Sequence, residues 1–322
     1  GYEYAITRLP ALWKWIYRLG GSTPGSPFRS RELVDILLRR LAVLDPAAVA
    51  CTHPFYHDLI HKARKRPGGP GFPLLTVLTD SISIHSLWLR HPGDRICVAD
   101  QHTAEVILSR GISADRLSVT GFPVHPVFTE LAPAPAPDGE TRPARLLYLP
   151  ATSRNHVAAT LGRLLEVRAA IPFTLTIVLG RHEQTLGRVI RDITANLPGI
   201  EVLGWTDQMP QLLCSHHLVV TKAGGATVNE AIAARCPLLL NYVVPGQEEG
   251  NAERVEKEIL GAVLSDPSSV AKMVEHLLQE PGMMTWHGWR RRLEEVARPE
   301  AALTIAAEIR EAGRAHNAAK AP

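Results

Sequence analysis

Two glycines and a glutamate in the segment "TKAGGATVNE", residues 221–230, have the types and spacing of a turn that binds a nucleotide. Gly224 and Gly225 follow an apolar run, and glycine lets a ligand come close to the backbone. The helix expected after them would add unpaired N–H groups and partial positive charge, which suit a diphosphate. Glu230 lies about one helical turn further on, where a carboxylate could accept two ribose hydroxyls.

The same segment also has a purely structural interpretation. Thr227 and Glu230 fit the S/T-x-x-E pattern of a capping box, in which the glutamate bonds the N–H of the capping residue. Two glycines before a helix are common in plain turns, and the spacing matches neither GxGxxG nor a P-loop. On this interpretation Glu230 stabilises its own helix and contacts no ligand.

A second polar cluster lies in "VVPGQEEGNAERV", residues 243–255. A Pro-Gly turn there delivers Gln247, Glu248 and Asn251 just past the end of an apolar run. Side chains of this kind can bind the hydroxyls of a sugar. The alternative is a solvated turn at the start of a helix.

The second part of the chain alternates short apolar runs with helical patterns, which predicts a parallel sheet with helices on both faces. The predicted strands are 144–151, 173–180, 200–205, 217–224, 237–243 and 261–265.

The first part has a similar but shorter series, with predicted strands 47–53, 73–80, 95–101 and 116–122. It opens on a helical, aromatic-rich segment, whereas a Rossmann-like half normally opens on a strand and a glycine-rich loop. We therefore expect this domain to be truncated at its start, with an unusual variant of the fold as the alternative.

Alternating proline and alanine in "LAPAPAPDGETRP" predict a stiff linker between the two parts. The expected domains are 1–130, a linker 131–143, a second domain 144–284, and a helical tail 285–322 that packs back on both.

The composition is that of a globular protein, with 45% hydrophobic and 21% charged residues in a chain of 322. A net charge of +3, without a base-reading module, argues against nucleic acid. The four cysteines include no CxxC pair, which predicts reduced thiols in a cytoplasmic protein. No apolar run is long enough to span a bilayer.

The segment 9–21, "LPALWKWIYRLGG", places apolar residues at helical spacing with cations on another face. Trp13 and Trp15 at headgroup level, with Lys14 and Arg18 toward acidic lipid, would suit a helix lying on a membrane surface. Packing of the same residues into the core of the first domain is an equal alternative.

The stretch 221–251, which contains both polar clusters, resembles the donor-site region of family 28 glycosyltransferases, near the monogalactosyldiacylglycerol synthase and processive diacylglycerol glucosyltransferase branch. Residues 77–128, with a TD…H..W stretch and a "GFPVHPVF" close, resemble the acceptor domain of that branch. The resemblance implies a GT-B fold, in which two Rossmann-like domains face a cleft. It also implies an inverting transfer of a hexose from a UDP-sugar to a membrane lipid such as diacylglycerol, with no metal or other cofactor.

Carried over to this chain, the resemblance places the diphosphate at residues 224–227, the ribose at Glu230, and the donor sugar or phosphate at the second polar cluster. Trp205 and Met209, taken singly, are also ordinary core residues. The implied donor-binding residues are Gly180, Arg181, Gly204, Trp205, Met209, Lys222, Gly224, Gly225, Ala226, Thr227, Glu230, Gln247, Glu248 and Asn251.

Two departures from the family pattern affect the chemistry. Family members begin with a glycine-rich loop whose histidine is the favoured general base, and we expect that histidine to lie outside this chain. Asp80 and His85 are the best remaining candidates, although Asp80 could be a turn residue and His85 a satisfied polar group. The family also has a glycine-rich loop after the first strand of the donor domain. Here that position reads "YLPATSRNH", residues 148–156, without a glycine, and Ser153 and Arg154 could contact phosphate there.

The expected partners are a UDP-sugar, a lipid acceptor and the cytoplasmic face of a membrane, where anionic lipid would attract the cations. Three other functions stay open. They are N-acetylglucosamine transfer to a lipid-linked precursor, a non-catalytic subunit that binds UDP or lipid, and a nucleotide-sugar epimerase. The acceptor-domain motifs argue against the last.

Overall fold

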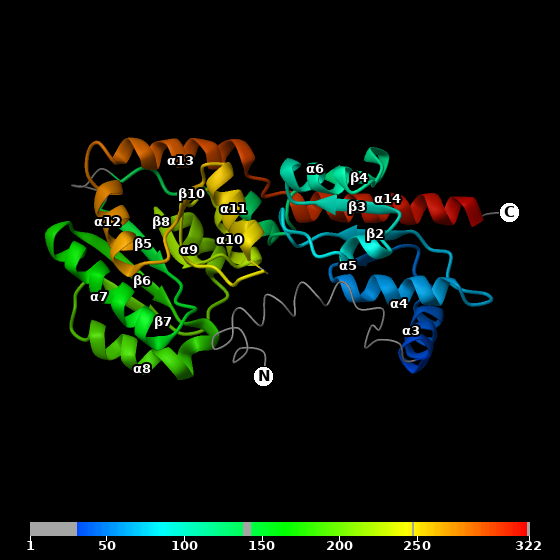
Figure 1. Cartoon of the computed structure of the whole chain (residues 1–322), viewed down its shortest axis with the longest axis horizontal. Coiled ribbons are helices and arrows are strands. Elements are labelled where there is room, and N and C mark those ends of the chain that lie inside the picture. The colour runs from blue at the N-terminus through cyan, green and yellow to red at the C-terminus, as the bar shows by residue number, and fades with distance from the viewer. Residues whose placement is uncertain (1–30, 138–142, 247, 321–322) are drawn as a thin grey trace. The chain divides into compact units, whose positions relative to one another are not determined.

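The computed structural model describes residues 31–137, 143–246 and 248–320. These residues form two compact units (Figure 1). The large unit is Val124–Pro299, and the small unit consists, in its described part, of residues 31–123 and 300–320. The predicted membrane-contact residues Trp13, Lys14, Trp15 and Arg18, and the predicted donor residue Gln247, lie outside the described residues.

The large unit contains a six-stranded parallel sheet with the order β10-β9-β8-β5-β6-β7. Because β5 comes first in the chain but lies at the centre, the strand order reverses between β5 and β8, as in a Rossmann fold. Ligands of such sheets bind beyond the carboxyl ends of the strands near that reversal. The strands are β5 (Ala144–Tyr148), β6 (Phe173–Val178), β7 (Ile200–Leu203), β8 (Leu218–Lys222), β9 (Leu238–Tyr242) and β10 (Gly261–Val263).

Helices cover both faces of this sheet (Figure 1). On one face α7 contacts both α8 and α12, and α10 contacts α9 and α13. The indole N–H of Trp286 on α13 donates to the carbonyl of His217, 2.7 Å away, and so ties α13 to the start of β8. The helices are α7 (Arg154–Ala170), α8 (Glu183–Thr194), α9 (Met209–Ser215), α10 (Gly225–Ala233), α11 (Glu249–Lys257), α12 (Pro267–Leu277) and α13 (Met283–Val296).

The small unit contains a four-stranded parallel sheet with the order β1-β2-β3-β4. The strands are β1 (Val49–Cys51), β2 (Leu74–Val77), β3 (Arg95–Val98) and β4 (Leu117–Val119). The helices are α3 (Arg31–Leu44), α4 (Pro54–Arg64), α5 (Leu87–Arg90), α6 (Gln101–Ser109) and α14 (Ala301–Lys320). Every strand predicted from the sequence is therefore present.

The predicted C-terminal tail divides between the two units, because α13 belongs to the large unit and α14 to the small one. On α14, Ile305 packs against Val77 and Cys97 of the small sheet. A Cβ added to Gly313 would lie 3.2 Å from the Cβ of Ala47, so a small residue lets α14 approach closely there.

The described part of the predicted linker packs on the large unit. The N–H of Ala134 donates to the carbonyl of Cys214 at 2.7 Å, and Ala134 is buried. The ring of His217 contacts the carbonyl of Pro135 through Nε2 at 3.0 Å and accepts the N–H of Arg145 at Nδ1 at 2.9 Å. Both ring nitrogens of this buried histidine are thus used to hold the segment.

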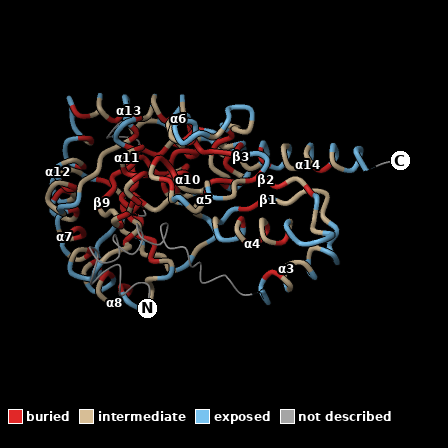
Figure 2. The backbone as a smooth tube through the Cα atoms, turned by 45° about the vertical axis from the view of Figure 1, so that its right-hand side comes forward, coloured by how far each residue is buried: buried red, intermediate tan, exposed pale blue. Residues whose placement is uncertain are grey.

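Buried residues gather along β9, α10 and α11 in the large unit, whereas α3 of the small unit is mostly half-buried or exposed (Figure 2). Val34 is the buried residue of α3. In the part of the chain that the structure describes, no helix combines the length and the apolar character needed to cross a bilayer.

Candidate functional site

The donor-site residues predicted within the described part of the chain lie at the carboxyl edge of the large sheet. They end or follow β6, β7, β8 and β9, or belong to the helices that start there. Parallel strands bring all of these turns to one edge, although the residues are far apart in the sequence. The large unit therefore carries the predicted donor residues at the edge where such sheets bind ligands.

The turn between β8 and α10 is formed by Gly224 and Gly225. Gly224 is the N-cap of α10, with φ −69° and ψ 131° and no side-chain cap, and its carbonyl accepts the N–H of Val228 at 3.0 Å. The capping-box interpretation is therefore wrong, because the helix begins at Gly225 and Thr227 is already its third residue. The first N–H groups of α10 lack a side-chain acceptor, which is the condition for binding an anion.

Lys222 and Glu248 form an ion pair beside this turn. The other carboxylate oxygen of Glu248 accepts the N–H of Val244 at 3.1 Å, so both of its oxygens are used within the protein. A Cβ at Gly224 would lie 2.9 Å from the Lys222 Nζ, so the glycine leaves room for the lysine head group beside the turn. The pair fixes a cation next to the helix N-terminus.

Asn251 on α11 braces the same turn, because its side-chain amide donates to the carbonyl of Ala223 at 2.9 Å. Its Oδ1 atom is buried and has no hydrogen-bond partner among the described residues. Glu248 and Asn251 were predicted to face the donor sugar. In the structure Asn251 bonds the turn after β8, and Glu248 bonds the turn after β9.

A buried polar network joins α10 to α11 behind the turn. Asn229 donates to the carbonyl of Gly225 at 2.8 Å and accepts from the Arg254 guanidinium at 2.8 Å. Arg254 also pairs with Glu258 at 3.3 Å, and the side chains of both residues are less than a tenth exposed. These bonds hold the start of α10 in place before any ligand binds.

Glu230 differs from its polar neighbours in α10. The structure gives its half-buried carboxylate no hydrogen bond or ion pair with the described residues. Burial raises the pKa of this carboxyl. Glu230 follows Ala226 and Thr227 by four and three residues, so the three share one face of the helix. Its carboxylate is available for a ligand bound at the start of α10.

The turns after β6 and β7 contact each other, since the N–H of Gly180 donates to the carbonyl of Gly204 at 3.1 Å. Gly180 has φ +51°, in the left-handed region that favours glycine. Arg181 is exposed, and Met209 is the first residue of α9. Trp205 is 74% exposed, so the alternative of a core residue is wrong for this tryptophan.

Ser153 and Arg154 both have structural partners at the start of α7. Ser153 is the N-cap, and its hydroxyl accepts the N–H of His156 at 3.4 Å. The Arg154 guanidinium donates to the carbonyl of Thr185 at 3.0 Å. Phosphate contacts by these two residues stay a prediction.

The predicted catalytic residues lie in the small unit, in the segment after β2. The Asp80 carboxylate accepts the indole N–H of Trp88 at 2.7 Å. Burial raises the pKa of Asp80, while the Trp88 bond and the nearby His85 oppose the shift. His85 accepts the N–H of Leu87 at Nδ1, 3.2 Å away.

One further histidine lies at this edge, and the sequence analysis did not single it out. His53 follows β1, is exposed, and is the N-cap of α4. Its ring contacts those of Phe55 and Tyr56, with centroid distances of 4.8 and 6.4 Å. The signal in the sequence was a titratable residue two positions after the apolar run "AAVAC".

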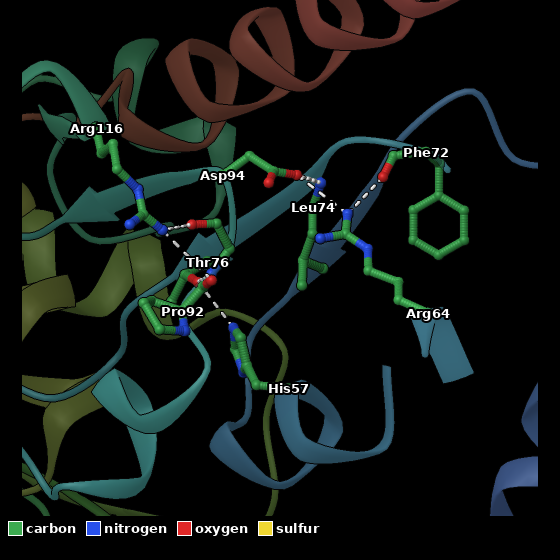
Figure 3. Close-up of polar contacts among 9 residues, drawn as sticks. His57, Arg64, Phe72, Leu74, Thr76, Pro92, Asp94 and Arg116 are labelled. Atoms are coloured by element: carbon green, nitrogen blue, oxygen red, sulfur yellow. Dashed lines mark hydrogen bonds and ion pairs between the residues drawn. The ribbon is translucent and has the colours of Figure 1, made fainter. Parts of the chain in front are cut away.

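Behind this edge a set of polar contacts crosses the small sheet (Figure 3). The Thr76 hydroxyl contacts the Nε2 of His57 at 2.8 Å and accepts the N–H of Gly93 at 2.9 Å. The Asp94 carboxylate accepts from the N–H of Leu74 at 2.7 Å and from Arg64 at 3.1 Å. These bonds tie α4 and the loop before β3 to the central strand β2.

No group of three or more His, Cys, Asp or Glu side chains able to hold a metal ion occurs within residues 31–137, 143–246 and 248–320. The cation that the donor turn itself offers is Lys222.

Two family models match the chain, and together they span well over half of it. The model described as monogalactosyldiacylglycerol (MGDG) synthase matches residues 2–124, and the glycosyltransferase family 28 C-terminal domain matches residues 155–282. The chain belongs to glycosyltransferase family 28. This confirms the resemblance inferred from the donor and acceptor motifs.

Among the curated relatives of this family 28 chain is the processive diacylglycerol beta-glucosyltransferase of Bacillus cereus (strain G9842). It is 28% identical over 220 residues, which are 67% of this chain and 56% of the relative. The Bacillus thuringiensis (strain Al Hakam) enzyme of the same name is 27% identical over 242 residues, 74% of this chain and 61% of the relative. The chain thus spans less than two thirds of the length of these relatives.

Solved structures confirm the predicted GT-B fold. Acinetobacter baumannii MurG superposes with a TM-score of 0.62 at 17% identity, over 90% of this chain and 82% of that one. MnaA of S. aureus, solved with UDP, superposes with a TM-score of 0.63 at 13% identity, over 89% and 84%. At these identities the likeness concerns the fold alone.

Proposed function

We propose that this chain is an inverting glycosyltransferase that moves a hexose from a UDP-sugar to a membrane lipid such as diacylglycerol. The observation that carries the proposal is the start of α10. It combines an uncapped helix N-terminus, the cation of Lys222, and a Glu230 carboxylate that makes no bond to the described part of the protein. Family 28 membership and the diacylglycerol glucosyltransferase relatives support the lipid acceptor.

In the proposed complex the donor diphosphate binds the N–H groups of Gly225, Ala226 and Thr227. The partial positive charge of the helix and Lys222 stabilise the departing UDP, so no metal ion is required. Glu230 accepts the ribose hydroxyls from the same face of α10. Glu248 and Asn251 position the turn, and Gln247 contacts the sugar.

The exposed Trp205 and the paired turns at Gly180 and Gly204 are available for the uracil base. A planar exposed ring offers a stacking surface, and the backbone of a turn offers donors and acceptors for the base edge. Arg181, also exposed, is placed to contact the phosphates. This assignment gives most of the predicted donor residues a part in one extended site.

The acceptor hydroxyl must lose a proton as it attacks the sugar. We assign this part of the reaction to the carboxyl edge of the small unit, where Asp80 and His85 lie. Because a diacylglycerol acceptor resides in a bilayer, we further propose that the protein works at the cytoplasmic membrane surface. Trp13, Lys14, Trp15 and Arg18 are its proposed contacts there, with anionic lipid as their partner.

The donor site is tested by the thermal stability of wild type and Glu230→Ala with and without UDP. We expect UDP to raise the melting temperature of wild type. Without UDP, Glu230→Ala should melt at the same temperature as wild type, but it should bind UDP about tenfold to a hundredfold more weakly, as expected for lost charged hydrogen bonds. Glu256→Ala, an exposed glutamate on α11, is the matched control. A wild type that UDP does not stabilise would contradict the donor site.

The reaction is tested by incubating the full chain with a radiolabelled UDP-hexose and diacylglycerol liposomes, with and without EDTA. Glycolipid formed equally in both conditions is the expected result. A free or altered sugar formed without lipid would indicate an epimerase. UDP binding without any product would indicate a non-catalytic subunit, and transfer only to a lipid-linked precursor would point to the N-acetylglucosamine branch.

A further inference from the structure

Residues 81–84, between β2 and α5 of the small unit, follow an unusual backbone path. Ile82 has φ +51°, in the left-handed region that side chains branched at Cβ rarely adopt. The N–H of Ser83 donates to the carbonyl of Ser81 at 2.5 Å, which makes a three-residue turn centred on Ile82. Such a turn is rare and strained when its central residue has a positive φ. We call residues 81–84 the tight turn.

The tight turn is buried in the small unit. Ser81, Ile82 and Ile84 are 3%, 9% and 5% exposed. The hydroxyl of Ser81 has no hydrogen-bond partner among the described residues. A strained backbone and an unpartnered buried hydroxyl both lower the stability of the fold. Strain of this kind persists where the surrounding structure imposes it, and it is concentrated at functional sites.

Thr103 on α6 holds the centre of the tight turn. Its Oγ1 atom accepts the N–H of Ile82 at 3.1 Å, and the residue is fully buried. The same hydroxyl donates to Oδ2 of Asp100 at 2.9 Å, while Oδ1 of Asp100 accepts the N–H of Thr103 at 2.7 Å. Because Asp100 takes the hydroxyl proton, the Thr103 oxygen presents its lone pairs to Ile82.

The other end of α6 holds the last residue of the tight turn. Nη1 of Arg110, the C-cap of α6, donates to the carbonyl of Ile84 at 2.9 Å. The side chain of Ile84 belongs to the same core cluster as Trp88 and Ile107. One helix therefore holds the turn at two points, and the bond to Thr103 acts directly on the strained residue.

The tight turn joins Asp80 to His85, the residues to which the proposed function assigns the acceptor. The Asp80 carboxylate, oriented by the indole N–H of Trp88, is a hydrogen-bond acceptor. His85 accepts the Leu87 N–H at Nδ1, so its neutral ring carries the proton on Nε2 and is a donor there. A diacylglycerol offers a hydroxyl that donates and ester carbonyls that accept. Its glycerol end matches this pair when the tight turn keeps both side chains in place.

We propose that Thr103 is a positioning residue of the acceptor site; the proposal rests on the function proposed above. It keeps the tight turn in its strained form and so directs Asp80 and His85 toward the glycerol end of the lipid. Thr103 itself touches no substrate, because it is fully buried. With the turn held in this form beforehand, lipid binding does not have to order the site.

The first test compares Thr103→Val with Thr194→Val, in which another buried threonine loses a hydroxyl bonded to its own helix. Activity is measured on the full chain with a UDP-hexose and diacylglycerol liposomes. Thr103→Val should lower kcat/KM for diacylglycerol about tenfold to a hundredfold, the effect of a misplaced group at a reaction site. The affinity for UDP should not change. Thr103→Ser keeps the hydroxyl and should lose much less, and Thr194→Val should keep the wild-type kcat/KM.

The second test uses the strain at Ile82. Ile82→Ala and Ile82→Gly both remove the side chain, but only alanine keeps the Cβ that opposes a positive φ. Ile82→Gly should therefore melt about 2–4 °C above Ile82→Ala. The loss of kcat/KM caused by Thr103→Val should be about threefold or more smaller in the glycine background, because glycine takes a positive φ without the bond to Thr103.

The results separate the positioning role from the proposed function. Unchanged kcat/KM in Thr103→Val, equal losses in the two Ile82 backgrounds, or equal melting temperatures of Ile82→Ala and Ile82→Gly would each overturn the positioning role and leave the proposed function standing. The comparison of melting temperatures decides the matter if Thr103→Val does not fold. A wild-type chain that binds UDP but makes no glycolipid overturns both.

Discussion

The two units present the same kind of surface, the carboxyl edge of a parallel sheet, but they hold it in different ways. In the large unit the turn after β8 is held by an ion pair from Glu248, an amide from Asn251 and a buried network behind them. In the small unit Asp80 is held by the indole N–H of Trp88, whose ring also packs edge-on against the ring of His57.

This difference fits the ligand proposed for each edge. A diphosphate is strongly charged and needs N–H groups and cations that are already in place. In the large unit Lys222, Glu248 and Asn251 bond groups of the turn itself, whereas Glu230 has no bond to the described residues. The proposed lipid acceptor has a largely apolar body, and the small unit presents two exposed aromatic rings, those of Phe55 and Tyr56.

The strongest test of the comparison removes the charge at the centre of the large unit's network. Arg254→Met leaves the buried Glu258 carboxylate and the Asn229 carbonyl without their cation. Breaking such a pair from one side typically costs about 3–5 kcal/mol of unfolding free energy, which urea titration would measure. Lys257→Met, which breaks an exposed pair with Glu253, is the control and should cost about 0.5 kcal/mol. Equal losses in the two variants would show that the network does not carry the turn.

Acid should weaken the large unit through His217. Burial lowers the pKa of this histidine to about 4 from 6.5, so the folded state favours the neutral ring. Its contribution is complete above pH 6.5 and is lost as the pH falls from 6.5 toward 4. The loss amounts to about 3 kcal/mol, at 1.36 kcal/mol for each pKa unit. Urea titrations across this pH interval should show that the unfolding free energy of His217→Gln falls less steeply with decreasing pH than that of wild type. The same pH dependence in both proteins would show that His217 does not cause the loss.

The small unit is tested by Trp88→Phe. The change removes the donor to Asp80 and leaves a gap where the Trp88 side chain, only 2% exposed, was packed. We expect a loss of about 2 kcal/mol, with faster hydrogen exchange in β2 and α4 and little change in the large unit. Asp80→Asn keeps an acceptor for the indole and should cost less. Equal exchange in both units would contradict the view that each edge is held separately.

The smallest effect on stability is expected at the donor turn itself. A Cβ in Gly224→Ala would push against the Lys222 Nζ, which is flexible, so the cost should be about 1 kcal/mol or less. The stabilisation by UDP should nevertheless be lost, because the ligand and Lys222 need this space. Gly162→Ala, in the interior of α7 with open space around it, should instead add about 0.5–1 kcal/mol. Normal UDP binding by Gly224→Ala would remove the turn from the donor site.

Local patterns were sufficient for the elements and for the donor motif. The apolar runs mark every strand, because fully buried parallel strands are continuously apolar. The glycine pair marked the turn before α10. The capping-box interpretation misplaced the cap of that helix by three residues, since Thr227 has the chemistry of a cap but Gly224 takes the extended cap conformation. Trp205 shows a similar limit, because residue type alone favours burial and the turn after β7 leaves it exposed.

The sequence by itself determined the two parallel sheets, the family and the residues gathered at the donor edge, because hydrophobic periodicity and turn chemistry act over a few residues. Only the tertiary structure decided how those residues are used. Glu248 bonds Lys222, which lies 26 positions away in the chain, and Asn251 bonds Ala223 across 28 positions. His57 bonds Thr76 of the neighbouring strand across 19 positions. Such contacts depend on strand order and packing, which no short stretch of sequence encodes.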